Sequence, residues 1–69
     1  MNRMTRNEAL EVAARDFAWI TGDDSFIILN IEPNHQDAWA WDVVARWPGD
    51  EFDTRATVWR EGDSEYCEW

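Results

Sequence analysis

Carboxylates and tryptophans are the side chains of this 69-residue chain whose number and spacing could support a function. The chain contains fifteen Asp and Glu residues and six Arg residues, so its formal net charge is −9. Residues 23–69 hold twelve of the acids and three of the arginines, and therefore carry the whole net charge. Carboxylates bind Arg side chains by bidentate hydrogen bonds, and aromatic rings bind cations by their faces. This combination favours recognition of a basic protein surface.

The candidate binding residues form two acidic clusters with aromatic residues between them. Carboxylates in turns would steer association with a basic partner, and Trp side chains would act as anchors. We predict that the following residues bind the partner: Asp50, Glu51, Asp53, Glu61, Asp63, Glu65, Glu68, Trp59 and Trp69. The alternative, that the acidic surface serves only solubility, stays open.

Residues for catalysis are scarce. His35 is the only histidine, and no Ser or Cys signature accompanies it. Cys67 lies beside Glu68, and neighbouring acids raise the pKa of a thiol, so a reactive thiolate is not expected. We expect no enzyme and no cofactor. A small hydrolase that uses a carboxylate pair is a remoter alternative, which a raised carboxyl pKa would favour.

The cysteine count and the acidic turns also bear on metals. A single cysteine excludes an internal disulfide and a cysteine-rich zinc site. The acidic turns 50–53 and 61–65 lack the twelve-residue spacing of a calcium loop, with Gly at position six and Glu at position twelve. We therefore expect no dedicated metal site.

The expected location is the cytoplasm. One cysteine fits a reducing compartment. The N-terminal residues contain no apolar run of signal-peptide length, and the longest apolar stretch, Phe26 to Leu29, is far too short to span a membrane. The negative charge argues against direct binding of nucleic acid or of an anionic membrane, because both require a positive surface.

A helix over about residues 6–21 is the clearest predicted element. Thr5 and Glu8 have the spacing of a capping box, and Gly22 suits the position after the last turn. The predicted apolar stripe consists of Leu10, Ala13, Ala14 and Phe17, with Ile20 near its edge. Val12 and Trp19 fall on the opposite side, which a simple amphipathic helix does not explain.

The rest of the chain predicts strands over about residues 26–31, 39–47 and 54–60, with 65–69 as a further edge strand. Short connections favour an antiparallel meander. We predict one domain over residues 1–69 with an α+β fold, in which one N-terminal helix packs on a three- to four-stranded antiparallel sheet.

Strand alternation predicts which side chains meet the helix. The expected helix-facing set is Trp39, Trp41, Val43, Ile27, Leu29, Ile31, Ala56 and Val58. The other face would then expose Phe26, Ile28, Val44 and Trp59, which is more apolar surface than a monomer needs. That face is a predicted contact site or dimer face, so the chain is expected to be a monomer or a weak dimer.

The chain resembles phage-encoded anti-CRISPR proteins, in particular small inhibitors of type I-C systems. The resemblance lies in the short α/β chain without a catalytic motif, the acidic segments 49–53 and 61–65, the N-terminal residues 1–10 and the Trp-rich segment 38–42. It implies a non-enzymatic inhibitor in the cytoplasm of the bacterial host cell. The implied partner is a Cascade subunit that contacts DNA, and acidic mimicry of DNA would block target-DNA or PAM recognition.

The chain also looks like small immunity proteins of bacterial toxin systems. Residues 8–17, followed by strands that contain Trp39 and Trp41, carry this second resemblance. It implies that the acidic face neutralises a basic toxin nuclease. Both resemblances describe a stoichiometric inhibitor of a nucleic-acid enzyme, and they differ in the target.

Overall fold

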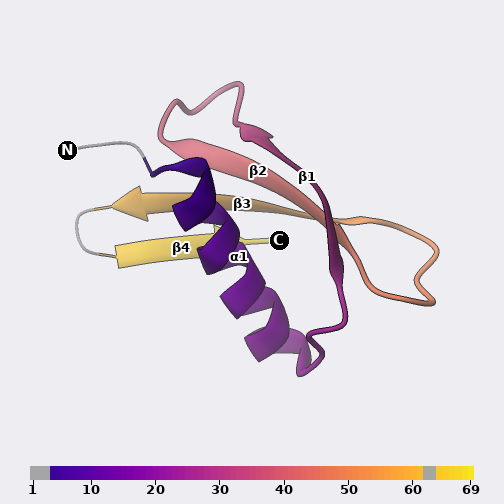
Figure 1. Cartoon of the computed structure of the whole chain (residues 1–69). Coiled ribbons are helices and arrows are strands. Elements are labelled where there is room, and N and C mark those ends of the chain that lie inside the picture. The colour runs from indigo at the N-terminus through magenta and orange to yellow at the C-terminus, as the bar shows by residue number, and fades with distance from the viewer. Residues whose placement is uncertain (1–3, 62–63) are drawn as a thin grey trace.

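The protein is one helix packed on a four-stranded antiparallel sheet, as predicted (Figure 1). The computed structural model describes residues 4–61 and 64–69, with the backbone alone at Glu61. The elements are α1 (Arg6–Thr21), β1 (Ile27–Pro33), β2 (Ala40–Arg46), β3 (Thr54–Glu61) and β4 (Ser64–Glu68). Each strand pairs with the next along the chain, so the sheet order is β1-β2-β3-β4.

Local hydrogen bonds define both ends of α1. The Thr5 hydroxyl accepts from the backbone N–H of Glu8 at 3.1 Å, and the Glu8 carboxylate accepts from the backbone N–H of Thr5 at 3.0 Å. This is the predicted capping box. Gly22 ends the helix with φ at 70°, and its N–H donates to the Ala18 carbonyl at 2.8 Å. Glycine adopts this left-handed conformation without the steric cost of a Cβ atom.

The buried face of α1 differs from the predicted stripe. The sheet covers Ala9, Val12, Ala13 and Phe17, and Val12 is only 4% exposed. The prediction placed Val12 on the opposite side and was wrong there. These residues follow the i, i+3, i+4, i+8 spacing of one helix face. The predicted stripe and the observed stripe share Ala13 and Phe17. The position of the sheet determines which of the two is buried.

A β-bulge interrupts the pairing of β1 with β2. Ile28 lies opposite Ala45, but Asn30 lies opposite Val44, so Leu29 is an extra residue on β1. An extra residue in one strand shifts the alternation of side chains between the two faces of the sheet. The residues before and after Leu29 therefore follow different alternations.

The bulge overturns the predicted faces of β1. Phe26 and Ile28 pack against the core on the helix side, together with buried Ile31. Ile27 and Leu29, which were expected in the core, are 62% and 51% exposed. The prediction assumed unbroken alternation from residue 26 to residue 31, and one extra residue is enough to reverse it.

The sheet face opposite α1 also differs from the prediction in which apolar residues it contains. Phe26 and Ile28 have left it, and Val44 is buried there. Trp59 is half-buried and stacks on Tyr66, with ring centroids 5.7 Å apart. Ile27 and Leu29 are exposed in place of Phe26 and Ile28, so the apolar residues outside the core are a different set from the predicted one.

Trp39, expected against the helix, is half-exposed before the start of β2 and is another correction. Trp41, its neighbour on the same predicted face, packs against the core. The Trp41 indole Nε1–H donates to the Met4 carbonyl at 2.9 Å. This bond ties the segment before α1 to the sheet.

Four aromatic rings close one end of the helix–sheet interface. The ring of fully buried Phe17 makes edge-to-face contacts with Phe26, Trp47 and Trp69, at centroid distances of 5.5, 5.4 and 4.9 Å. Such pairs add stability beyond the burial of their area. Trp69, at the end of the chain, is thus a packing residue on one side, while about half of its surface stays exposed.

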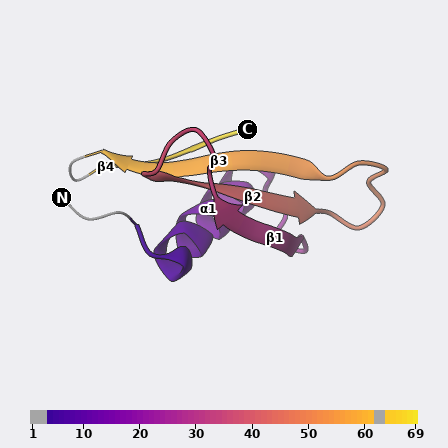
Figure 2. The same cartoon turned by 90° about the horizontal axis from the view of Figure 1, so that it is seen from above.

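The molecule is elongated along its strands. The helix lies on one side of the sheet (Figure 2), and the Cα trace extends 39 Å along its longest axis. The β2–β3 loop (residues 47–53) and the last residues of β3 lie at opposite ends of the sheet, because β3 runs from one end to the other (Figure 1). Eight residues of β3 separate them by about 24 Å.

We predict that Phe17→Ala destabilises the protein strongly. Removal of a buried aromatic ring costs about 3–5 kcal/mol, through lost burial and the cavity left behind. Phe52→Ala is the matched control, because Phe52 is 79% exposed, and it should stay within about 0.5 kcal/mol of the parent. Urea unfolding followed by tryptophan fluorescence measures both. Equal effects of the two substitutions would contradict the packing described for Phe17.

Candidate protein-interaction surface

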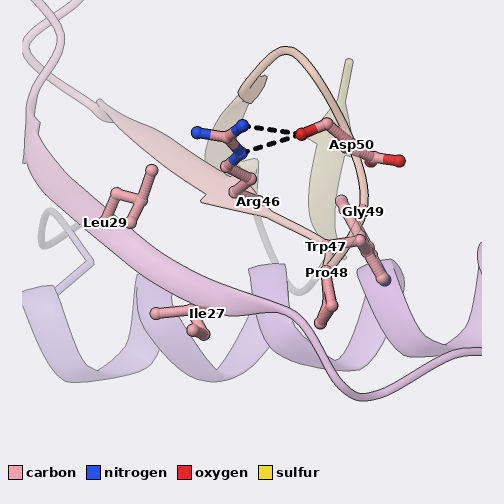
Figure 3. Close-up of a pocket in the computed structure, with 7 residues that line it drawn as sticks. All are labelled: Ile27, Leu29, Arg46, Trp47, Pro48, Gly49 and Asp50. Carbon is pink, nitrogen blue, oxygen red and sulfur yellow. Dashed lines mark hydrogen bonds between the residues drawn. The ribbon is translucent and has the colours of Figure 1, made fainter.

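A braced turn presents the first acidic cluster. The β2–β3 loop starts with Trp47-Pro48-Gly49-Asp50, in which the Asp50 N–H donates to the Trp47 carbonyl at 3.1 Å. Gly49 has φ at 90°, a conformation that favours glycine. The Arg46 guanidinium donates from Nε and Nη2 to the Asp50 carbonyl oxygen, at 3.0 and 2.7 Å (Figure 3). These bonds hold the start of the loop against the end of β2.

The carboxylates of this loop are exposed and uncompensated. Asp50, Glu51 and Asp53 all lie at the surface. Within residues 4–61 and 64–69, none of these three carboxylates forms an ion pair. Arg46, just before this loop, bonds to the backbone carbonyl of Asp50 instead of to its carboxylate. The loop therefore presents negative charge at the surface.

An apolar hollow lies beside the acidic loop. It has a volume of about 430 Å³ between the first half of β1 and the start of the β2–β3 loop (Figure 3). The residues that line it are Ile27, Leu29, Arg46, Trp47, Pro48, Gly49 and Asp50. The β1 bulge creates this hollow, because it leaves both Ile27 and Leu29 at the surface.

The α1–β1 loop adds two more carboxylates at this end of the sheet. The Trp47 indole Nε1–H donates to the Asp23 carbonyl at 3.0 Å, which holds this loop beside the β2–β3 loop. Ser25 donates to the Asp23 carboxylate from its hydroxyl and its backbone N–H, and these bonds lower the pKa of Asp23. Asp24 is exposed next to it. A carboxylate that accepts such bonds stays ionised at neutral pH.

Glu65, from the second predicted acidic cluster, lies toward the other end of the sheet. Glu65 faces Arg60 across β3 and β4, at 3.5 Å, and Arg60 also binds Glu8 at the start of α1. The Glu65 carboxylate is therefore partly neutralised within the protein. Glu61 ends β3, and its side chain lies outside the described residues, as does Asp63.

The remaining predicted residues are scattered. Glu68 is exposed on β4 opposite Thr57, on the sheet face away from α1. Trp59 lies on the same face, in its stack with Tyr66. Trp69 instead packs on Phe17, on the helix side. The structure therefore brings Asp50, Glu51 and Asp53 together in one loop. Trp69 packs against Trp47 at the start of this loop, with ring centroids 5.8 Å apart, whereas Trp59, Glu65 and Glu68 lie elsewhere on the sheet.

The sequence interpretation missed the apolar part of the surface. Ile27 and Leu29 were assigned to the core, and Pro48 was not among the predicted binding residues. The segment Phe26-Ile27-Ile28-Leu29 is apolar at every position, so it contains no alternation from which an exposed pair could be recognised. The bulge becomes visible only in the pairing with β2.

Groups suited to covalent or metal chemistry are sparse in the described residues. Burial raises the pKa of the Cys67 thiol to about 11, and the nearby Asp16 charge acts in the same direction. Residues 4–61 and 64–69 contain no group of three His, Cys, Asp or Glu side chains placed to hold a metal ion. In the same part of the chain, no helix has the length and apolar character needed to cross a membrane.

Comparisons with protein-family models, with curated proteins and with solved structures find no match to this chain. Fold and surface together define it as a two-layer α+β protein. Its distinguishing feature is an acidic and partly apolar surface at one end of the sheet.

We predict that Glu8 makes stability depend on pH in the acid range. Hydrogen bonds from the Thr5 backbone and from Arg60 lower the pKa of Glu8 from 4.5 to about 2. A lowered carboxyl pKa in the folded state stabilises the protein above the unfolded pKa, and this stabilisation disappears as the pH falls through the folded pKa. The thermal stability gap between the parent and Glu8→Gln should therefore narrow from pH 4.5 to pH 2.

Arg60→Gln provides the comparison for this measurement. The Thr5 backbone bond is the largest cause of the shift, so Arg60→Gln should keep part of the acid dependence, whereas Glu8→Gln should lose it. Melting curves at intervals of half a pH unit measure both variants. A gap that stays constant from pH 6 to pH 2 would show that Glu8 is not held in this way.

We predict that Cys67 reacts slowly in the folded protein. The thiolate is the nucleophile, so a pKa of about 11 leaves roughly a hundredfold less thiolate at pH 8 than an ordinary cysteine has. Modification with a disulfide reagent at pH 8 should be about two orders of magnitude slower in buffer than in 8 M urea. Similar rates in the two solutions would refute the buried position of the thiol.

Proposed function

We propose that this protein acts by stoichiometric binding to a basic protein surface, without catalysis. The observation that carries the proposal is the β2–β3 loop, whose three carboxylates are exposed and have no cation partner among the described residues. Proteins leave such charge unpaired at a cost in self-repulsion, and a basic partner would remove that cost while the charges accelerate association.

The surface that this partner offers is proposed to be one that normally holds nucleic acid. Carboxylates substitute well for phosphates, because both accept bidentate bonds from Arg. The longest dimension of the protein, 39 Å, is close to one turn of duplex DNA, about 34–36 Å. The acidic loop lies at one end of this axis and Glu65, which Arg60 partly neutralises, toward the other, with Glu68 and Asp42 on strands between them. These dimensions support mimicry of a short duplex.

The particular target is proposed from the resemblance to anti-CRISPR proteins. On that basis the protein works in the cytoplasm of a bacterial host cell and binds a DNA-contacting subunit of a type I-C surveillance complex, which blocks recognition of the target DNA or the PAM. The alternative target is a basic toxin nuclease, for which the same acidic surface is suitable. Both proposed targets bind nucleic acid, and proteins that do so carry a positively charged surface.

Size-exclusion chromatography with a purified type I-C surveillance complex tests the target. Co-elution that excess target DNA prevents would support competition at the DNA-binding surface. Co-elution that DNA leaves unchanged would reject mimicry but keep inhibition. Absence of co-elution would exclude this target and move the test to a panel of basic toxin nucleases.

We predict that Glu51→Lys with Asp53→Lys weakens this binding at least tenfold, because two attractive charges become repulsive. Asp50 is left intact, since its carbonyl braces the loop through Arg46. Glu11→Lys with Glu32→Lys is the matched control: both of its side chains are exposed on other elements, and it changes the net charge by the same amount. Titration by biolayer interferometry measures the dissociation constants. Equal weakening by both pairs would mean that only total charge matters.

A further inference from the structure

We propose that the hollow beside β1 binds an apolar side chain carried by a basic segment of the partner, so that Ile27 and Leu29 anchor what the acidic loops attract. The proposal rests on the proposed function in one respect, the basic character of the partner. It adds a site and a ligand chemistry: an aliphatic residue flanked by Arg or Lys.

The lining of the hollow is suited to an aliphatic side chain. Ile27 and Leu29 are 62% and 51% exposed, although both are large apolar residues on a strand. Trp47 and Pro48 form the opposite wall, and Arg46 with the Asp50 carbonyl closes one side (Figure 3). Interface hot spots usually lie in apolar pockets of this kind, with a few polar groups at the rim.

Charge around the hollow selects a basic occupant. Five exposed carboxylates lie in the two loops at this end of the sheet, namely those of Asp23, Asp24, Asp50, Glu51 and Asp53. The guanidinium groups of Arg46 and Arg55 offset part of this negative charge. Arg46 is already bonded to the loop backbone. The net charge around the hollow is therefore negative. Arg or Lys residues that flank the inserted side chain would meet this negative charge.

A second copy of this chain is a poor occupant. Each copy carries a net charge of −9, and the carboxylates would face one another across the contact. An added β-strand along β1 is also disfavoured, because the bulge at Leu29 and the proline at position 33 are features that block edge pairing. The remaining fit is a side chain inserted into the hollow from a basic surface.

Nuclear magnetic resonance with a model peptide tests the proposal without the proposed target. The probe is N-acetyl-Arg-Arg-Leu-Arg-Arg-amide, and the control peptide carries Ser in place of Leu. The leucine peptide should bind at least about tenfold more tightly, because the hollow buries its side chain. Its addition should shift the signals of Ile27, Leu29 and the Trp47 indole N–H.

Two variants of equal chemistry locate the site. Ile27→Gln should remove the preference for leucine, whereas Ile20→Gln should preserve it, since Ile20 is 61% exposed but lies on α1. Equal affinity for the two peptides, shifts centred on β4, or signals that move with protein concentration alone would each overturn the proposal. A leucine preference together with no binding to the type I-C complex would keep this site and reject that target.

Discussion

The contact of Phe17 with three other aromatic rings is the interaction on which the rest of the structure depends. Its ring meets Phe26 before β1, Trp47 after β2 and Trp69 after β4, so one side chain of the helix holds three separate segments. Trp47 then positions the loops outside the core, because it donates to the Asp23 carbonyl and begins the turn that presents Asp50. Burial of a few large rings is an efficient way to stabilise so small a core.

The candidate interaction surface is a consequence of how this core closes. The same residues that end β2 also form one wall of the hollow, and the loop that follows carries exposed carboxylates. At the other end of the sheet, Arg60 joins Glu8 to Glu65 and neutralises part of the local charge. The described acids of the two ends therefore differ: Glu8 and Glu65 pair with Arg60 at one end, and the carboxylates of the 50–53 loop have no cation partner among the described residues at the other.

Much of the fold could be predicted from the sequence because its signals are local. The helix has its capping residues within three positions of each other, and the strands are bounded by turn residues. The site could be predicted only in part. The acidic loop 50–53 was recognised by its composition. The hollow beside it depends on the exposure of Leu29, which follows from the pairing of β1 with a strand about fifteen residues away in the sequence.

The sequence by itself determined the helix bounded by Thr5 and Gly22, the α+β fold and the concentration of negative charge after residue 22. These properties depend on residue types and on neighbours along the chain. Only the tertiary structure decided which side of α1 is buried and which residues of β1 are exposed. Val12 is buried and Leu29 is exposed, the reverse of what was expected. Apolar residues occur on more than one side of the helix and at every position from 26 to 29, and the approach of β2 selects one arrangement.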